Sequence, residues 1–268
     1  MDRRWEAETY ERDSVKLSYI IHGSGPTILF LHGATVSKES WAAQLGHFGN
    51  DYRVVAPDLR GHGASEPGTE AHTVEMYAAD IVALLDRLAI NDAVVCGHSA
   101  GGFVAQQLAL DHPERVSSLV LVDTSYGITT TLWERLMNAM ARAYLKNTSG
   151  PKLVKAFAES AGKHNEATRE YCYRAMQKFA DHKNRFFQIW HAVENFRSKH
   201  RLSEIRQPTL IVSPDRFAQA AGQAKHMARV IPNASRVIVR DAGHMVMMDN
   251  PEGFNDVLSH FLQARGPK

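Results

Sequence analysis

The sequence predicts an α/β fold with a mostly parallel central sheet, helices on both of its faces and an inserted helical unit. Three observations carry this prediction. Short β-branched runs alternate with helical patterns up to about residue 125, helices alone fill residues 127–204, and the alternation returns from residue 205. The chain has 268 residues, enough for a substantial core. We expect one α/β core, residues 1–126 and 205–268, interrupted by a helical cap, residues 127–204.

The elements follow from hydrophobic patterning. Apolar residues at helical spacing predict a helix over residues 74–88 with Thr73 as its N-cap, and a last helix over 251–264. Turn-forming residues at 147–151 and 162–165 divide the insertion into three or four helices. The runs at 27–31, 93–96 and 116–122 are continuously apolar, as in strands buried on both faces. Strands are expected at residues 14–21, 27–31, 53–56, 93–96, 116–122, 209–212 and 236–239.

Composition argues against several classes of protein. The 31 Lys and Arg residues nearly balance 29 Asp and Glu residues, and no basic run stands out, so no nucleic-acid partner is expected. Cys96 and Cys172 have no closely spaced partner, which favours a reducing compartment such as the cytoplasm. Residues 1–6 are charged and lead into no apolar signal core, and turn-forming residues at 23–26 divide the longest uncharged stretch. We therefore expect no secretion signal, no spanning helix and no membrane partner.

Ser99 is the strongest candidate for chemistry. It lies in Gly97-His98-Ser99-Ala100-Gly101, between a buried strand and a helix. A serine at such a sharp turn tolerates only small neighbours, and its hydroxyl is raised above the sheet edge. Backbone N–H groups at the start of the helix point toward the same space, where an oxyanion would develop. We predict a nucleophilic serine.

Two other segments can complete such a site. In His32-Gly33-Ala34, the glycine lets the chain turn so that the N–H of Ala34 faces the same oxyanion. His244 follows the last strand and comes after the serine in chain order. An imidazole there can act as the base that a weakly nucleophilic hydroxyl needs.

Four motifs in order give the chain its resemblance to a known family: His32-Gly33, residues 56–65 (APDLRGHGAS), the Ser99 turn and Asp241-Ala242-Gly243-His244. Over nearly its whole length the chain resembles the α/β-hydrolase fold superfamily, in particular serine hydrolases with a helical cap. The resemblance implies that Ser99 is the nucleophile, that His244 is general base and then acid, and that the N–H groups of Ala34 and Ala100 form the oxyanion hole. It also implies that residues 127–204 roof the pocket and that His62 is a packed residue.

The acid that orients His244 stays open between two aspartates. Many relatives carry Gly-x-x-Asp after the strand that is 209–212 here, but this chain has Ser213-Pro214-Asp215-Arg216, with Asp215 one position early. Other relatives place the acid after the preceding core strand, where Asp123 follows residues 120–122. Both precede His244, as the order Ser, acid, His requires. Loop spacing favours Asp123.

Metal and nucleotide chemistry lack their signatures. The chain has no His-Glu-x-x-His, no close Cys/His cluster and no Gly-x-x-x-x-Gly-Lys. The Gly-x-Gly pairs at 23–25 and 61–63 lack the third glycine of a dinucleotide fingerprint. No metal and no cofactor are expected.

Apolar stripes in the insertion indicate the substrate. The stripes within 132–144 and 186–193 should mostly pack the cap onto the core, while some members line the pocket. Trp133, Met137, Phe186 and Trp190 are the candidate lining residues. Such a wall favours an apolar or aromatic acyl compound.

Three functions fit this pattern. The first is a cofactor-free serine hydrolase that cleaves a small carboxylic ester or lactone through an acyl-enzyme, with a small molecule as its partner and a homodimer as its assembly. The second, on the same fold, is carbon–carbon bond hydrolysis or cofactor-independent oxygenation of an aromatic heterocycle. The third is a small-molecule receptor with residual hydrolase activity. The fold alone does not choose among them.

Overall fold

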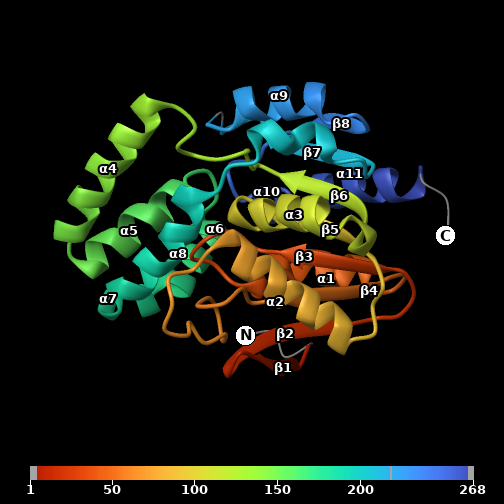
Figure 1. Ribbon diagram of the computed structural model, residues 1–268, viewed down its shortest axis with the longest axis horizontal. Coiled ribbons are helices and arrows are strands. Elements are labelled where there is room, and N and C mark those ends of the chain that lie inside the picture. The colour runs from red at the N-terminus through yellow and green to blue at the C-terminus, as the bar shows by residue number, and fades with distance from the viewer. Residues whose placement is uncertain (1–4, 218, 265–268) are drawn as a thin grey trace.

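The computed structural model describes residues 5–217 and 219–264. Residues 1–4, part of the segment on which the expectation of no leader rests, lie outside this range. The described strands form one sheet in the order β1-β2-β4-β3-β5-β6-β7-β8 (Figure 1). The first two strands pair antiparallel, β2 pairs antiparallel with β4, and the strands from β4 to β8 are parallel. The predicted α/β class with a mostly parallel sheet is confirmed.

Strand bounds agree closely with the expected ones. The strands are β1 Ala7–Arg12, β2 Val15–His22, β3 Thr27–Leu31, β4 Arg53–Pro57, β5 Ala93–His98, β6 Val116–Val122, β7 Thr209–Pro214 and β8 Ala234–Val239. Strand β1 was not predicted, since among Ala7–Arg12 only Tyr10 is buried and no apolar pattern marks the strand.

Helices cover both faces of the sheet because alternate strand residues point to opposite sides. Leu29 and Leu31 pack with α2 (Val74–Arg87), α3 (Ala100–Asp111) and α9 (Ala221–Val230). Ile28 and Phe30 pack on the other face, with α1 (Ala42–Phe48), α10 (Val246–Asp249) and α11 (Pro251–Gln263). The three apolar runs predicted to be buried on both faces are β3, β5 and β6, and they are almost entirely buried.

The insertion contains more helices than expected. Between β6 and β7 lie α4 (Leu132–Asn147), α5 (Gly150–Ala161), α6 (Glu166–Met176), α7 (Lys178–Asp181), α8 (Lys183–Asn195) and the short helix η3 (Lys199–Glu204). The breaks predicted at 147–151 and 162–165 fall between α4 and α5 and between α5 and α6. Figure 1 shows these helices beside one end of the sheet, with α4 at the outside. No helix within the described residues is long and apolar enough to cross a membrane.

Candidate active site

Ser99 lies at the turn between β5 and α3, with a backbone that residues other than glycine rarely adopt (φ 51°, ψ −118°). The turn is tight. A Cβ on Gly97 would lie 2.3 Å from the carbonyl oxygen of Gly101, and a Cβ on Gly101 would lie 2.3 Å from that of Leu31. The predicted demand for small neighbours is confirmed, and its cause is backbone contact.

Hydrogen bonds from the adjacent strand hold this turn in place. The N–H of Ser99 donates to the carbonyl of Val122, 3.0 Å away, and the hydroxyl of Thr124 donates to the carbonyl of Ser99 at 2.7 Å. The backbone of Ser99, a half-buried residue, is therefore fixed relative to the end of β6.

Asp123 and His244 meet at the same sheet edge. Nδ1 of His244 lies 2.6 Å from a carboxylate oxygen of Asp123, and their side chains are 24% and 3% exposed, in the order His244 and Asp123. Asp123 itself has φ 38°, so its backbone turns immediately after β6. Since a carboxylate accepts hydrogen bonds, Nδ1 of a neutral His244 carries the proton and Nε2 is free to take another.

Asp215 supports the same loop in another way. Its Oδ1 accepts the backbone N–H of Ala242 at 3.1 Å, and its side chain is exposed at the end of β7. Of the two candidate acids, the structure therefore brings Asp123 to the imidazole and leaves Asp215 on the backbone two residues before it.

His98 was not among the candidates, yet it joins the serine turn to the histidine loop. Its Nε2 lies 2.8 Å from the carbonyl oxygen of His244, and the two rings are 4.7 Å apart. A carbonyl only accepts, so Nε2 carries the proton, and Nδ1, which is buried and has no hydrogen-bond partner among residues 5–217 and 219–264, is unprotonated. Burial, with the neighbouring His244 charge, lowers the pKa of His98 well below 6.5.

The loop after β3 differs in detail from the expectation. We expected Gly33 to provide a sharp turn, but the positive φ belongs to Thr35 (66°). Gly33 is needed for close approach, because a Cβ there would lie 2.8 Å from Nδ1 of His98. Ala34 and Ala100, the expected oxyanion donors, both line the cavity beside Ser99.

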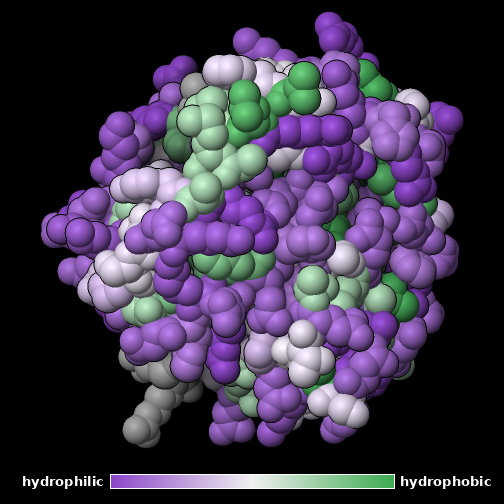
Figure 2. Space-filling view, turned by 60° about the vertical axis from the view of Figure 1, so that its left-hand side comes forward, coloured by the Kyte–Doolittle hydropathy of each residue, from purple (hydrophilic) through white to green (hydrophobic). Residues whose placement is uncertain are grey.

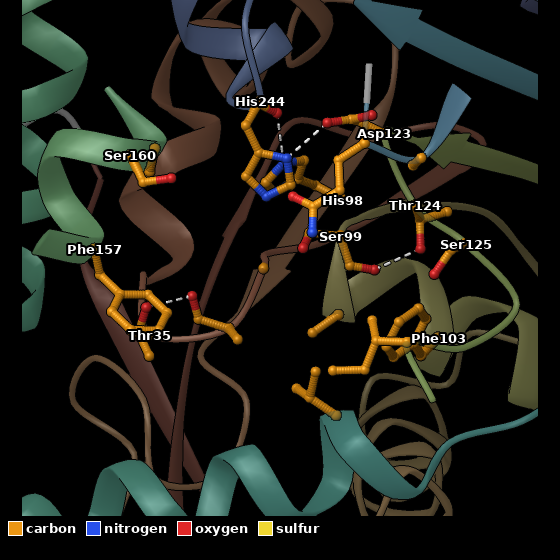
Figure 3. Close-up of a pocket in the computed structure, with 18 of the residues that line it drawn as sticks. Thr35, His98, Ser99, Phe103, Asp123, Thr124, Ser125, Phe157, Ser160 and His244 are labelled. Carbon is orange, nitrogen blue, oxygen red and sulfur yellow. Dashed lines mark hydrogen bonds and ion pairs between the residues drawn. The ribbon is translucent and has the colours of Figure 1, made fainter. Parts of the chain in front are cut away.

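One cavity of about 640 Å³ opens over these residues. In Figure 3, Ser99 lies close to His98 and to Thr124, and Phe157 faces it across the cavity. The walls come from both the core loops and the insertion, and none of the described lining residues is a lysine or arginine. The lining carboxylates belong to Asp123 and Glu134.

The four candidate lining residues divide into two pairs. Met137 and Trp190 line the cavity. Trp133 is 68% exposed on the outer side of α4 and lies outside the lining. Phe186 is fully buried in the core of the insertion and stacks on Trp190 with ring centroids 5.6 Å apart. For Trp133 and Phe186 the expectation was wrong, because helical spacing does not tell which side of a helix faces the cleft.

Sequence reasoning also missed part of the wall. Phe157 of α5 meets Trp190 edge to face at 5.7 Å, and the Phe217 ring lies 5.0 Å from that of His244. Neither residue lies in a motif. Thr124 and Ser125 also line the cavity, and their place directly after a buried strand could have identified them.

Metal ligands do not gather within residues 5–217 and 219–264, where no group of three or more His, Cys, Asp or Glu side chains could hold an ion. Cys172 lines the cavity, but burial raises its thiol pKa to about 12. His62 is buried against His32, as the resemblance implied.

Known proteins share this sequence and fold. A family model described as alpha/beta hydrolase fold matches residues 26–251. A dihydrolipoyllysine-residue acetyltransferase component of an acetoin cleaving system, from Cupriavidus necator, is 29% identical over 93% of this chain and 67% of its own length. A 3-oxoadipate enol-lactonase from Acinetobacter baylyi is 32% identical over 45% of this chain and 46% of its own.

A solved structure extends the similarity to three dimensions. Est816, described as an N-acyl homoserine lactone degrading enzyme, aligns with a TM-score of 0.82 and 27% identity, over 95% of this chain and all of that one. The chain belongs to the alpha/beta hydrolase fold family and is an enzyme of that family.

Proposed function

We propose that the chain is a cofactor-free serine hydrolase that cleaves a small, neutral, largely apolar carboxylic ester or lactone. The observation that carries this proposal is the contact between Asp123 and His244. These two residues and Ser99, which lies at a strained turn, line one cavity. A hydroxyl, an imidazole and an orienting carboxylate are the groups that acyl transfer through an acyl-enzyme requires.

In the proposed mechanism, Oγ of Ser99 attacks the substrate carbonyl carbon while Nε2 of His244 accepts its proton. Asp123 holds Nδ1–H and stabilises the imidazolium. The N–H groups of Ala34 and Ala100 receive the oxyanion. Collapse of the intermediate breaks the ester bond, and His244 returns the proton to the leaving alcohol. Water then attacks the acyl-enzyme with His244 again as base, which releases the acid and restores Ser99.

The lining of the cavity supports a neutral substrate. Phe157, Met176 and Trp190 offer an apolar wall, whereas the lining carboxylates of Asp123 and Glu134 are negative. A substrate carboxylate would lose its hydration there without gaining a cationic partner among the described lining residues.

The relatives support the reaction class. One is named an acetyltransferase, one an enol-lactonase, and one degrades N-acyl homoserine lactones. All three names describe transfer of an acyl group or conversion of a lactone, which a nucleophilic serine can perform.

Labelling with a fluorophosphonate tests the proposal. Intact mass and peptide mapping should find one adduct, on Ser99, and a folded Ser99→Ala variant should take up none and lose at least about 10³-fold in kcat. Near-normal ester turnover by Ser99→Ala would refute the serine mechanism. Tight ligand binding with very slow turnover by the intact protein would instead point to a receptor.

Cofactor-independent oxygenation, or carbon–carbon bond hydrolysis, is the second candidate. The position of Asp123 after β6, the strand that precedes the insertion, favours it, because some proteins with such chemistry resemble this chain in placing their acid there. In that case His244 would deprotonate the substrate and Ser99 would only position it. Activity retained in Ser99→Ala, with or without oxygen uptake, would support this candidate against acyl transfer.

We also place the proposed enzyme in the cytoplasm. Cys96 and Cys172 are both buried free thiols, which a reducing compartment suits. Fractionation of the native host, followed by detection of the chain, tests this placement.

A further inference from the structure

Helix α4 carries an apolar stripe that no other part of the described chain covers. None of its residues is buried, and Leu132, Met140 and Tyr144 are 83%, 59% and 72% exposed. The expectation that this stripe packs onto the core was wrong. Figure 2 shows a band of apolar side chains on this side of the molecule, bordered by polar ones. The exposed stripe, called here the α4 face, consists of Leu132, Trp133, Leu136, Met137, Met140 and Tyr144.

The other sides of α4 already have partners, so the α4 face is the side turned outward. Glu134 and Asn138 line the cavity, and Asn138 donates to Glu194 of α8 at 2.9 Å. Arg142 pairs with the same Glu194 carboxylate. Met137 is 44% exposed and also lines the cavity. The α4 face and the lining of the active-site cavity therefore share Met137.

Positive charge is concentrated in the same part of the chain. Residues 127–204 hold 14 Lys or Arg against seven Asp or Glu, although the whole chain has 31 against 29. Lys183 donates to the carbonyl of Lys146 at 2.7 Å, which brings two ammonium-bearing residues to the C-terminal end of α4. Within the described residues, Lys146 and Lys152 are exposed and neither has an acidic partner within 4 Å.

We propose that the α4 face docks on an anionic lipid surface, with α4 lying in the plane of the interface. An exposed helix with leucine and methionine on one side, Trp133 and Tyr144 near its two ends and lysines at its C-terminal end has the features of interfacial helices. Charge complementarity selects the occupant, since a second copy would bring two basic insertions together, whereas anionic headgroups attract them.

This surface mode also revises the expectation of no membrane partner. That expectation rested on the lack of a spanning segment, and a helix lying in the interface needs none. The proposal goes beyond the hydrolase function and does not depend on it, because docking is measurable without turnover. If both hold, a neutral lipophilic ester would reach Ser99 past Met137.

Vesicle flotation of the full chain tests the docking surface. Vesicles of phosphatidylcholine with about one third phosphatidylglycerol should bind the chain, pure phosphatidylcholine should bind it at least about tenfold more weakly, and high salt should weaken binding to the anionic vesicles. Ser99→Ala should bind like the wild type, so loss of the proposed catalysis and loss of docking are separable.

Matched variants assign the binding to the α4 face. A Leu132→Ser/Leu136→Ser/Met140→Ser variant should bind anionic vesicles at least about tenfold more weakly. Ile238→Ser, which removes a side chain 50% exposed on β8, should bind normally. Lys146→Gln/Lys152→Gln should lose about fivefold per lysine, and the exposed pair Lys16→Gln/Lys225→Gln should lose little.

Two results would overturn the proposal. One is equal vesicle binding by wild type and the triple serine variant. The other is a dimer in sedimentation velocity that the same triple variant abolishes while wild-type binding to anionic vesicles is absent, which would assign the α4 face to a second copy of the chain.

Discussion

The Nε2–H of His98 donates to the backbone carbonyl of His244 over 2.8 Å, and so the residue before Ser99 holds the loop that carries the imidazole. Burial keeps the His98 ring neutral, because its pKa lies well below 6.5. The contact therefore fixes the spacing between the serine turn and the histidine loop at neutral pH. The acceptor is the backbone carbonyl of His244 and not its imidazole. This hydrogen bond can therefore position the imidazole without occupying either of its ring nitrogens.

Replacement of His98 should impair catalysis through this contact. We expect His98→Leu to lower kcat/KM by about 10- to 100-fold, because His244 is then less well oriented toward Ser99. His98→Gln keeps an N–H donor and should recover most of the loss. The rate of fluorophosphonate labelling of Ser99 reports the same effect without a substrate. Equal activity in His98→Leu and wild type would mean that the contact only supports packing.

The two aspartates should differ sharply when each becomes asparagine. Asp123→Asn removes the carboxylate that holds Nδ1 of His244 and should lower kcat by about 10⁴-fold. Asp215→Asn keeps an oxygen for the N–H of Ala242 and should change kcat by less than about fivefold. Steady-state kinetics with one ester on both variants decides between them. A larger loss in Asp215→Asn would make it the acid.

Gly101 should not tolerate a methyl group. A Cβ there would lie 2.3 Å from the Leu31 carbonyl oxygen, so Gly101→Ala should lower the free energy of unfolding by at least about 2 kcal/mol. Gly222 in α9 is the matched control, because a Cβ there would meet no atom within 4 Å. Gly222→Ala should raise stability by up to about 1 kcal/mol. Urea unfolding measures both, and a stable Gly101→Ala protein would contradict the tight turn.

Stability should fall as the pH drops below 6.5. Burial lowers the pKa of His32, His62 and His98, so the unfolded chain takes up protons that the folded chain does not. The free energy of unfolding should therefore be highest above pH 6.5 and decrease by up to about 1.4 kcal/mol per pH unit for each neutral buried ring. Urea midpoints between pH 8 and pH 5.5 measure the slope. In His62→Asn the slope should decrease by the contribution of about one proton taken up on unfolding. A free energy of unfolding that does not change with pH would show that these rings take up protons in the folded chain.

A charge on the acyl chain of the substrate should lower turnover strongly. A 4-nitrophenyl ester with an unbranched neutral acyl chain should have a kcat/KM at least about 30-fold higher than the matched ester whose acyl chain ends in a carboxylate, because burying that charge costs about 2 kcal/mol or more. The absorbance of the released 4-nitrophenol measures both rates. Preference for the charged ester would reveal a cationic partner outside the described lining.

The sequence predicted the parts of the site that local chemistry determines. Gly97 and Gly101 mark the serine turn because only glycine allows the backbone contacts there. The acid was harder, since β6 and β7 are neighbours and both Asp123 and Asp215 follow them at the same sheet edge. Spacing along the chain favoured Asp123 but could not tell which carboxylate reaches the imidazole.

Tertiary contacts decided what the sequence could not. The period of residues 132–144 predicted an amphipathic helix, and α4 is one, but a period does not say what covers the apolar side. Phe186 and Trp190 belong to one stripe, yet Trp190 faces the cavity while Phe186 lies beneath it. Phe217 reaches His244 from a loop that has no pattern at all.

The position of Asp123 at the end of β6 separates two roles that one loop could have shared, namely orienting His244 and lining the cavity. Because the carboxylate that meets His244 comes from this strand, the segment after β7 is released from it, while Phe217, Gln219 and Ala220 still line the cavity. Asp215 and Phe217 still contact the His244 loop, whereas substitutions at Gln219 and Ala220 can reshape the wall without removing either member of the Asp123–His244 pair. For directed evolution of substrate range, Gln219 and Ala220 are therefore the natural positions at which to begin a library.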